Sequence, residues 1–368
     1  GYFGGGGGGG NGSGCSSATG GSGSSYVNSS FVSGSAITTA ATRAAGSVTI
    51  AVTYPPEAPT GALASPLNAS ASVNWTAPTN NGGAAISGYR IDRATGPTFV
   101  DWSTINANTG TSATNYTSTG LTNETSYKYR IYAINSNGTS TSYAETNAAT
   151  PSASLFISTW ATTDTVTLPL ADGTFGGVAN VYDFTVYWGD GTSTEVDSAS
   201  EGTHTYSSPG TYTVSIDGTI KGFRFANGGD KAKIRNVSQW GSLNFGNGGG
   251  YFSGASSLTA TATDAPDLAG TTDLSSAFDG ASSFNSNISN WDTSAVTSMG
   301  GMFAFATSFN QPLTSTPDGW STESVTSLYA VFQGASSFNQ DLSSWDTCHV
   351  NNTAYTFTGA TSFSQNRS

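Results

Sequence analysis

A repeated pattern in the last third of the chain decides the fold. It is clearest in FNSNISNWDTSAVTSMGGMF (residues 284–303) and in FNQDLSSWDTCHV (residues 338–350). Aligned on Phe-x-x-Ala-x-x-Phe-Asn, it has five copies, of which the first is degenerate and the last carries Ser364 in place of Asn. The copies begin at Phe252, Phe278, Phe303, Phe332 and Phe357, which are 26, 25, 29 and 25 positions apart. Such a period is typical of stacked repeats, in which no unit can bury its apolar face alone.

Tryptophans keep step with these phenylalanines. Four of them stand 12 positions before a leading Phe, and Pro266 takes that place in the remaining unit; they are Trp240, Trp291, Trp320 and Trp345. Apolar residues then follow at every third or fourth position, which predicts one tight helical or 3₁₀-like turn in each coil. Apolar residues that precede three of the tryptophans predict a short strand, at Ile288, Leu313 and Leu342.

Stacking would place equivalent residues of neighbouring coils above one another. The side-chain amides of Asn285, Asn310 and Asn339 are then expected to satisfy backbone groups at the turn. In the last copy, Thr353 and Thr356 replace apolar residues. This change indicates either a capping coil or a sequence that is cut at this point.

Glycine recurs two residues after the leading phenylalanine. Gly280, Gly334 and Gly359 occupy this place, whereas Phe305 breaks the rule in one copy. Glycine adopts backbone conformations that other residues resist. We therefore expect such a conformation at this position of every coil.

The two quoted stretches resemble BspA-type leucine-rich repeat surface proteins. The resemblance covers roughly residues 236–368. It implies a leucine-rich-repeat-like solenoid, bacterial cell-surface attachment and contact with a host or matrix, and similar arrays also occur in eukaryotic microbes and viruses. We expect a solenoid of about five coils over residues 220–368.

Residues 55–151 read as strands at regular spacing. They include SASVNWTAP (70–78), ISGYRIDRA (86–94) and SYKYRIYAIN (126–135), and in the last of these, apolar and polar residues alternate as in a half-buried strand. Leu121 and Tyr127 are spaced as in a tyrosine corner, in which the phenol forms a hydrogen bond back across a sandwich. The segment resembles a fibronectin type III domain, which implies a β-sandwich.

Residues 152–219 carry a second strand-rich pattern. WGDG (188–191), HTY (204–206) and PGTYTV (209–214) follow one another. These motifs resemble a polycystic-kidney-disease (PKD) domain, which implies another β-sandwich. In families with BspA-type repeats such a segment often precedes the array.

Residues 1–54 begin GYFGGGGGGGNGSG and end GSVTIAVTY. Val48, Ile50 and Val52 alternate with small or polar residues, which predicts a half-buried strand rather than a linker throughout. The segment resembles the C-terminal part of glycine-rich domains in some receptor kinases and bacterial surface proteins. The fold class is therefore mainly β, with a glycine-rich module, two sandwiches and a solenoid.

Composition excludes several functions. The chain has 368 residues, of which 9% are charged, and its net charge of −12 argues against binding to nucleic acid. No apolar run approaches the length of a membrane span. Cys15 and Cys348 lie in opposite terminal regions, so we expect no disulfide between them.

The sequence also gives little support for a catalytic site or a metal site. His204 lies within the HTY motif, where a strand position is expected. Cys348 and His349 are adjacent, and neighbouring residues usually point apart, so they do not predict a catalytic dyad. Asp190, Asp292 and Asp346 follow Trp or Gly in turn-like contexts, where local backbone capping is expected. We therefore predict no catalytic, cofactor-binding or metal-binding residue, and calcium at such turns is the one metal left open.

These features together predict an extracellular, surface-displayed adhesin or interaction protein without catalytic activity. The sandwiches act as spacers and the repeats as the contact surface, with an unidentified host or matrix protein or a surface glycan as partner. A virion tail-fibre or capsid-decoration protein is an alternative. A fibre-forming homo-oligomer, or the accessory region of a secreted polysaccharide enzyme, is another.

Overall fold

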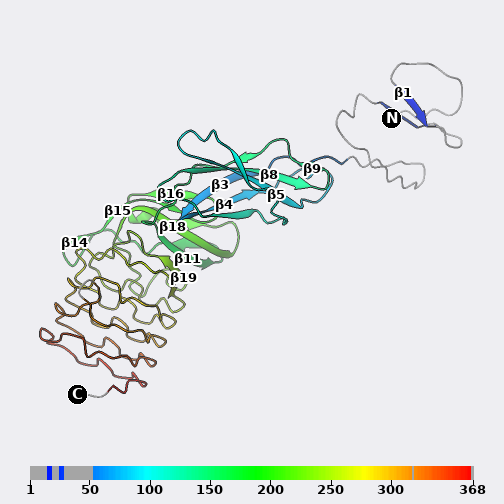
Figure 1. Cartoon of the computed structure of the whole chain (residues 1–368). Coiled ribbons are helices and arrows are strands. Elements are labelled where there is room, and N and C mark those ends of the chain that lie inside the picture. The colour runs from blue at the N-terminus through cyan, green and yellow to red at the C-terminus, as the bar shows by residue number, and fades with distance from the viewer. Residues whose placement is uncertain (1–14, 19–24, 29–52, 317–318, 366–368) are drawn as a thin grey trace.

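The computed structural model describes residues 15–18, 25–28, 53–316 and 319–365. Within this part the chain is mainly β, as expected, and Figure 1 shows two sheet-containing domains followed by a stack of coils. Strands β1 (Cys15–Ala18) and β2 (Ser25–Asn28) pair in antiparallel fashion. The other residues of the expected glycine-rich module, as far as residue 52, lie outside the described residues. Val48, Ile50 and Val52 are among them.

The first domain consists of two facing antiparallel sheets. One contains β3 (Thr60–Leu67), β4 (Ser70–Thr76) and β7 (Asn115–Thr119). The other contains β10 (Ala144–Glu145), β8 (Tyr127–Asn135), β5 (Gly88–Thr95) and β6 (Ser103–Asn106), and β9 (Gly138–Thr139) also pairs with β8. Side chains of β8 alternate between buried and half-buried, because every second residue faces the core.

The core of this domain confirms the tyrosine corner. The Tyr127 phenol oxygen accepts a hydrogen bond of 3.0 Å from the Thr122 backbone N–H. Leu121 and Tyr127 are both buried, as are Trp75 and Tyr89, whose rings meet edge to face. The sequence pattern therefore identified both the strands and the contact that joins the two sheets.

The second domain is built on one six-stranded sheet. Its order is β16 (Ser193–Val196), β15 (Val181–Tyr187), β18 (Gly210–Lys221), β11 (Phe156–Thr162), β19 (Ile234–Gln239) and β20 (Thr259–Ala260). Smaller elements are the pairs β12 (Thr165–Thr167) with β17 (Thr203–Thr205) and β13 (Thr174–Phe175) with β14 (Val178–Ala179), and the 3₁₀ helix η2 (Ala199–Glu201). All pairings in the large sheet are antiparallel except β19 with β20.

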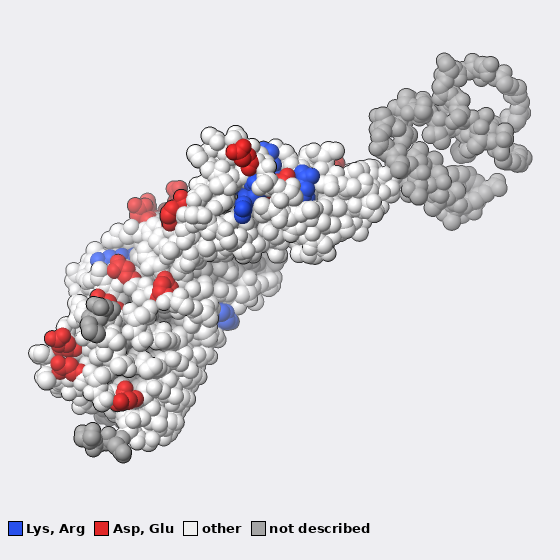
Figure 2. Space-filling view, viewed as in Figure 1, with Lys and Arg blue, Asp and Glu red and all other residues white. Residues whose placement is uncertain are grey.

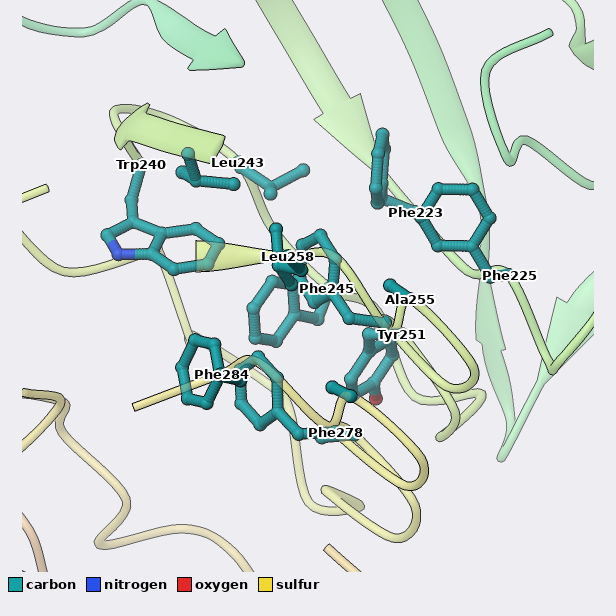
Figure 3. Packing of buried hydrophobic residues seen from close by; sticks show 14 of the residues in the cluster. Phe223, Phe225, Trp240, Leu243, Phe245, Tyr251, Ala255, Leu258, Phe278 and Phe284 are labelled. Carbon is teal, nitrogen blue, oxygen red and sulfur yellow. The ribbon is translucent and has the colours of Figure 1, made fainter. Parts of the chain in front are cut away.

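This sheet continues into the repeats. The boundary expected between residues 219 and 220 falls inside β18, and β19 and β20 come from the region expected to form the solenoid. One hydrophobic cluster runs without interruption from Phe156 to Phe338. Figure 3 shows Phe223 and Phe225 facing Phe245, Tyr251 and the first coils. The first coil covers the end of the sheet, which would otherwise expose apolar side chains to water.

The two domains meet directly. The Ser215 hydroxyl of β18 donates a buried hydrogen bond of 2.9 Å to the Pro66 carbonyl of β3. The Gln239 amide donates to the Ser152 and Leu155 carbonyls, which ties the connecting segment to β19. The described part of the chain is therefore elongated, with the coil stack at one end (Figure 1).

Backbone hydrogen bonds explain how the coils stack. In the turn that begins at Met299, alternate N–H groups donate to the next coil, as Met299 does to Ser327 and Gly301 to Tyr329. The N–H groups between them close tight turns within the coil, as Met302 does to Met299. The turn expected in each coil is thus confirmed, and each of these buried groups finds a partner.

The short strands expected at Ile288, Leu313 and Leu342 are not formed. Ile288 instead begins a turn, because its carbonyl accepts from the Trp291 N–H at 3.1 Å, and Leu342 does the same with Trp345. The parallel bridges between coils lie elsewhere in the repeat and join Asp273, Ser298, Ser327 and Asn352 in succession. Ile288 and Leu313 are fully buried, so their apolar character reflects burial in the core and not a strand conformation.

The asparagine ladder is confirmed. The Asn285 side-chain oxygen accepts a hydrogen bond of 2.8 Å from the Asn310 N–H, and Asn310 in turn accepts one of 2.9 Å from the Asn339 N–H. The side chain of Asn339 accepts from the Ser364 N–H at 3.0 Å. Each amide therefore holds the following coil at one edge of the stack.

The recurrent glycines also behave as expected. Gly280, Gly334 and Gly359 have φ values of 70°, 67° and 76°, in the left-handed region. Phe305 adopts φ of 54° at the same position, although it has a side chain. Its ring lies over Gly334, where an added Cβ would come within 2.6 Å of the ring, whereas a Cβ at Gly280 would meet nothing closer than 3.6 Å.

These contacts predict unequal effects of two alanine substitutions. Gly280→Ala should lower the free energy of unfolding by about 1 kcal/mol through backbone strain alone. Gly334→Ala should lower it by about 2–3 kcal/mol, because the new methyl group also displaces the Phe305 ring. Urea unfolding of the full chain measures both. In a Phe305→Gly background the two effects should become equal, and a difference that persists there would contradict the assignment.

Candidate interaction surfaces

The interior of the coil stack forms two aromatic ladders. In the first, the rings of successive leading phenylalanines lie parallel with centroids 5.7–5.8 Å apart, from Phe252 to Phe357. In the second, Phe284, Phe309, Phe338 and Phe363 follow one another at 6.0–6.1 Å. The ladders touch within each coil, since Phe303 and Phe309 are 4.0 Å apart. The stacking of these aromatic rings stabilises the packing of each coil on the next, and so fixes the positions of the residues on the surface of the array.

The Gly189-Asp190-Gly191 turn of the second domain holds a polar cluster. One Asp190 carboxylate oxygen lies 2.8 Å from His204 Nε2, and the other accepts from the Thr192 N–H at 3.0 Å and its hydroxyl at 2.7 Å. His204 lies on β17 as expected and stacks on Trp188, with centroids 5.0 Å apart. The Tyr206 hydroxyl donates to the Trp188 carbonyl at 2.9 Å and closes the cluster.

This cluster holds a turn and does not match a nucleophilic triad. Both Asp190 and the Thr192 hydroxyl, at 3.4 Å, approach the same nitrogen of His204. A catalytic histidine instead uses one ring nitrogen for the nucleophile and the other for the carboxylate. Burial alone would raise the pKa of the Asp190 carboxyl, but hydrogen bonds from Thr192 and His204 outweigh it and lower that pKa.

The other residues that were weighed as candidates from the sequence, and not predicted as a site, occupy turns in the coils. Asp292 accepts from the Ser294 N–H at 3.1 Å and Asp346 from the Cys348 N–H at 2.8 Å, which confirms local capping and lowers the pKa of both carboxyls. The same Asp346 raises the pKa of the exposed Cys348 thiol, which disfavours the reactive thiolate. His349 Nδ1 lies 2.9 Å from the Glu323 carbonyl oxygen of the preceding coil.

Acidic groups line a groove of about 600 Å³ beside β15, β16 and β18. Repulsion from Glu201 raises the pKa of the Asp197 carboxyl, and burial raises that of Asp217. The groove also contains Asp183 and Glu195. Within the described residues, no three His, Cys, Asp or Glu side chains are arranged to hold a metal ion.

The outer face of the β5–β8 sheet in the first domain combines cations with aromatic rings. The Arg130 guanidinium lies 3.8 Å from the Trp102 ring and 4.3 Å from the Tyr143 ring, and Arg90 lies 3.7 Å from Tyr132. Glu145 forms ion pairs with Arg130 at 2.9 Å and with Lys128 at 3.4 Å. Figure 2 shows basic groups gathered on the first domain, and most of the surface in this view is uncharged. Because the charges already pair within the face, it mainly stabilises the sheet.

Exposed aromatic side chains stand at the turn edge of the coil stack, the edge formed by residues 299–305, 328–334 and 353–359. Phe305, Tyr329 and Tyr355 are 52%, 44% and 58% exposed. Tyr329 and Tyr355 do not recur at their positions in the other repeats, so no pattern in the sequence marks them. Only the stacking of coils shows that they share an edge with Phe305.

Comparison with known families distinguishes two regions. The fibronectin type III domain family matches residues 57–148, the segment in which the two facing sheets and the tyrosine corner lie. Residues 57–148 form a fibronectin type III domain. A family described as "Mycoplasma protein of unknown function, DUF285" matches residues 247–368, which include the described coils. Among curated proteins, none matches the chain.

Several solved structures resemble part of the chain. The twitchin kinase region from C. elegans is 24% identical and covers 26% of the chain, with a TM-score of 0.22. Domains from titin are 26% identical over 26% of the chain (TM-score 0.23), and an Fn3-like protein from Clostridium thermocellum is 24% identical over 26% (TM-score 0.22). The chain spans 16%, 32% and 93% of these three structures.

Within the described residues, no helix is long and apolar enough to cross a membrane.

The Asp190 cluster predicts a specific loss of stability in acid. Because the folded-state pKa of Asp190 is lowered, its contribution is present above the unfolded pKa and is lost as pH falls through the folded value. Asp190→Asn should lower the free energy of unfolding by about 1–3 kcal/mol at pH 6. The gap between the two proteins should narrow below about pH 4.

Urea unfolding at a series of pH values measures this gap. Asp341→Asn is a matched control, since Asp341 caps an exposed turn in the coils through the Ser343 N–H without a histidine partner. A gap for Asp190→Asn that stays constant down to pH 2.5 would rule out a charged role for Asp190.

Proposed function

We propose that this chain is an extracellular, surface-displayed adhesin or interaction protein without catalytic activity. The two N-terminal domains act as spacers, and the coil stack supplies the contact surface. The fibronectin type III domain supports this proposal, because such domains are common in surface and interaction proteins. The location that we propose is the surface of a cell or of a virion.

We also propose finer family assignments for the other two regions. The contacts among Trp188, Asp190, His204 and Tyr206 support a PKD-like domain, because they join the WGDG and HTY motifs into one cluster. The parallel bridges and aromatic ladders support a solenoid of BspA type.

One observation carries the proposal: the hydrophobic cluster is continuous from the sheet of the second domain to the last coils. A stack that shares its core with a sheet cannot swing freely about a linker. It therefore presents a fixed surface at one end of an elongated molecule (Figure 1), which lowers the entropy cost of binding a partner.

Two further observations bear on activity and partners. The geometry at His204 and the raised pKa of the Cys348 thiol support a non-catalytic role. The net charge of −12 supports a partner other than nucleic acid. A host or matrix protein and a surface glycan are the partner classes that we propose.

Surface display is tested with antibodies against the full chain on the organism or particle that produces it. We expect labelling of intact cells or virions, and loss of the label after treatment with an external protease. Labelling that appears only after permeabilisation would refute the proposal. Mass spectrometry of purified particles then assigns the label to the cell or to the virion.

A further inference from the structure

Two of the three exposed aromatic residues of the turn edge adopt a strained backbone conformation. Phe305 and Tyr355 have φ values of 54° and 60°, which bulky side chains rarely adopt. In other coils, the position of Phe305 is taken by Gly280 or Gly334, whereas Ser276, Gly301 and Ala330 adopt the same left-handed conformation at the position of Tyr355. Strain of this kind costs about 1–2 kcal/mol per residue, and the exposed rings offset little of it by burial.

The edge is also rigid. The carbonyls of Tyr329 and Gln333 accept hydrogen bonds from Gly301 and Phe305 of the preceding coil at 2.7 and 2.6 Å, and Ala330 donates to Ala354 of the following one at 2.8 Å. The Tyr329 and Tyr355 rings stand 5.7 Å apart at an angle of 82°. The backbone that carries these three aromatic residues is therefore fixed by the stack before any partner arrives, which reduces the entropy lost on binding.

Charge distinguishes among partner classes. Residues 299–316, 324–340 and 350–365 contain no Asp, Glu, Lys or Arg, and the corresponding turn of the preceding coil carries one acid, Asp279. Anionic polymers would find no cation in these segments, and the whole chain repels them with its charge of −12. What the edge provides is ring faces, together with amide and hydroxyl groups such as those of Gln333 and Thr358.

We propose that the turn edge formed by Phe305, Tyr329 and Tyr355 binds a neutral polysaccharide. The C–H faces of the sugar rings pack on the exposed aromatic rings, and the sugar hydroxyls exchange hydrogen bonds with the neighbouring uncharged side chains. This inference rests on the proposed function and names the class of its ligand.

Affinity electrophoresis of the full chain tests the proposal in gels that contain soluble β-glucan, mannan or galactan. Alginate and heparin serve as anionic probes. We expect retardation by at least one neutral polymer and none by the anionic ones. No retardation by any neutral polymer, or retardation by the anionic polymers alone, would overturn the proposal.

Variants separate stacking from other contacts. Tyr329→Ser with Tyr355→Ser should weaken binding about tenfold or more, whereas Tyr329→Phe with Tyr355→Phe keeps the rings and should change it less than about twofold. Val181→Ala is a control at an exposed apolar side chain of β15, away from the coils. Equal binding by the Ser and Phe variants would contradict the stacking contact.

Phe305→Gly provides a readout that a purely structural role would not give. It removes the left-handed strain, so the unfolding midpoint should stay the same or rise while polysaccharide binding weakens. A fall in stability with unchanged binding would show that Phe305 is only structural. Surface labelling without polysaccharide binding would overturn this inference alone, and binding without surface labelling would overturn only the proposed display.

Discussion

The alternation of backbone hydrogen bonds in the coils is the constraint on which the rest of the repeat region depends. One N–H closes a turn inside its own coil, and the next reaches the following coil. This pattern requires residues in right-handed and in left-handed backbone conformations, which explains the positive φ values at Gly280, Phe305 and Gly334. It also sets the spacing between coils, so the phenylalanine rings stack at nearly constant separation.

The same constraint makes the surface of the stack a periodic scaffold. Buried positions must repeat because they touch their equivalents in the neighbouring coils, as the two ladders do. Exposed positions are free to vary, and it is there that Tyr329 and Tyr355 differ from the other copies. A contact surface can therefore change from coil to coil without disturbing the core.

The second domain and the coil stack are continuous because the first coils cover the edge of the six-stranded sheet. β19 would be an open edge, and β20 of the first coils pairs with it in parallel. The degenerate first repeat, led by Phe252, packs against Phe223 and Phe225 of the second domain rather than against a full coil. Its departure from the repeat pattern thus reflects a different neighbour.

The sequence by itself determined what depends on local pattern. Alternation identified β8, the Leu121–Tyr127 spacing identified the tyrosine corner, and the repeat phase identified the asparagine ladder. Tertiary structure decided what depends on neighbours distant in the chain. Apolar character alone could not show that Ile288 begins a turn, that β18 crosses an expected boundary, or that three scattered aromatics share one edge. Burial and the position of an edge are set by the packing of whole coils, which periodicity within one coil does not encode.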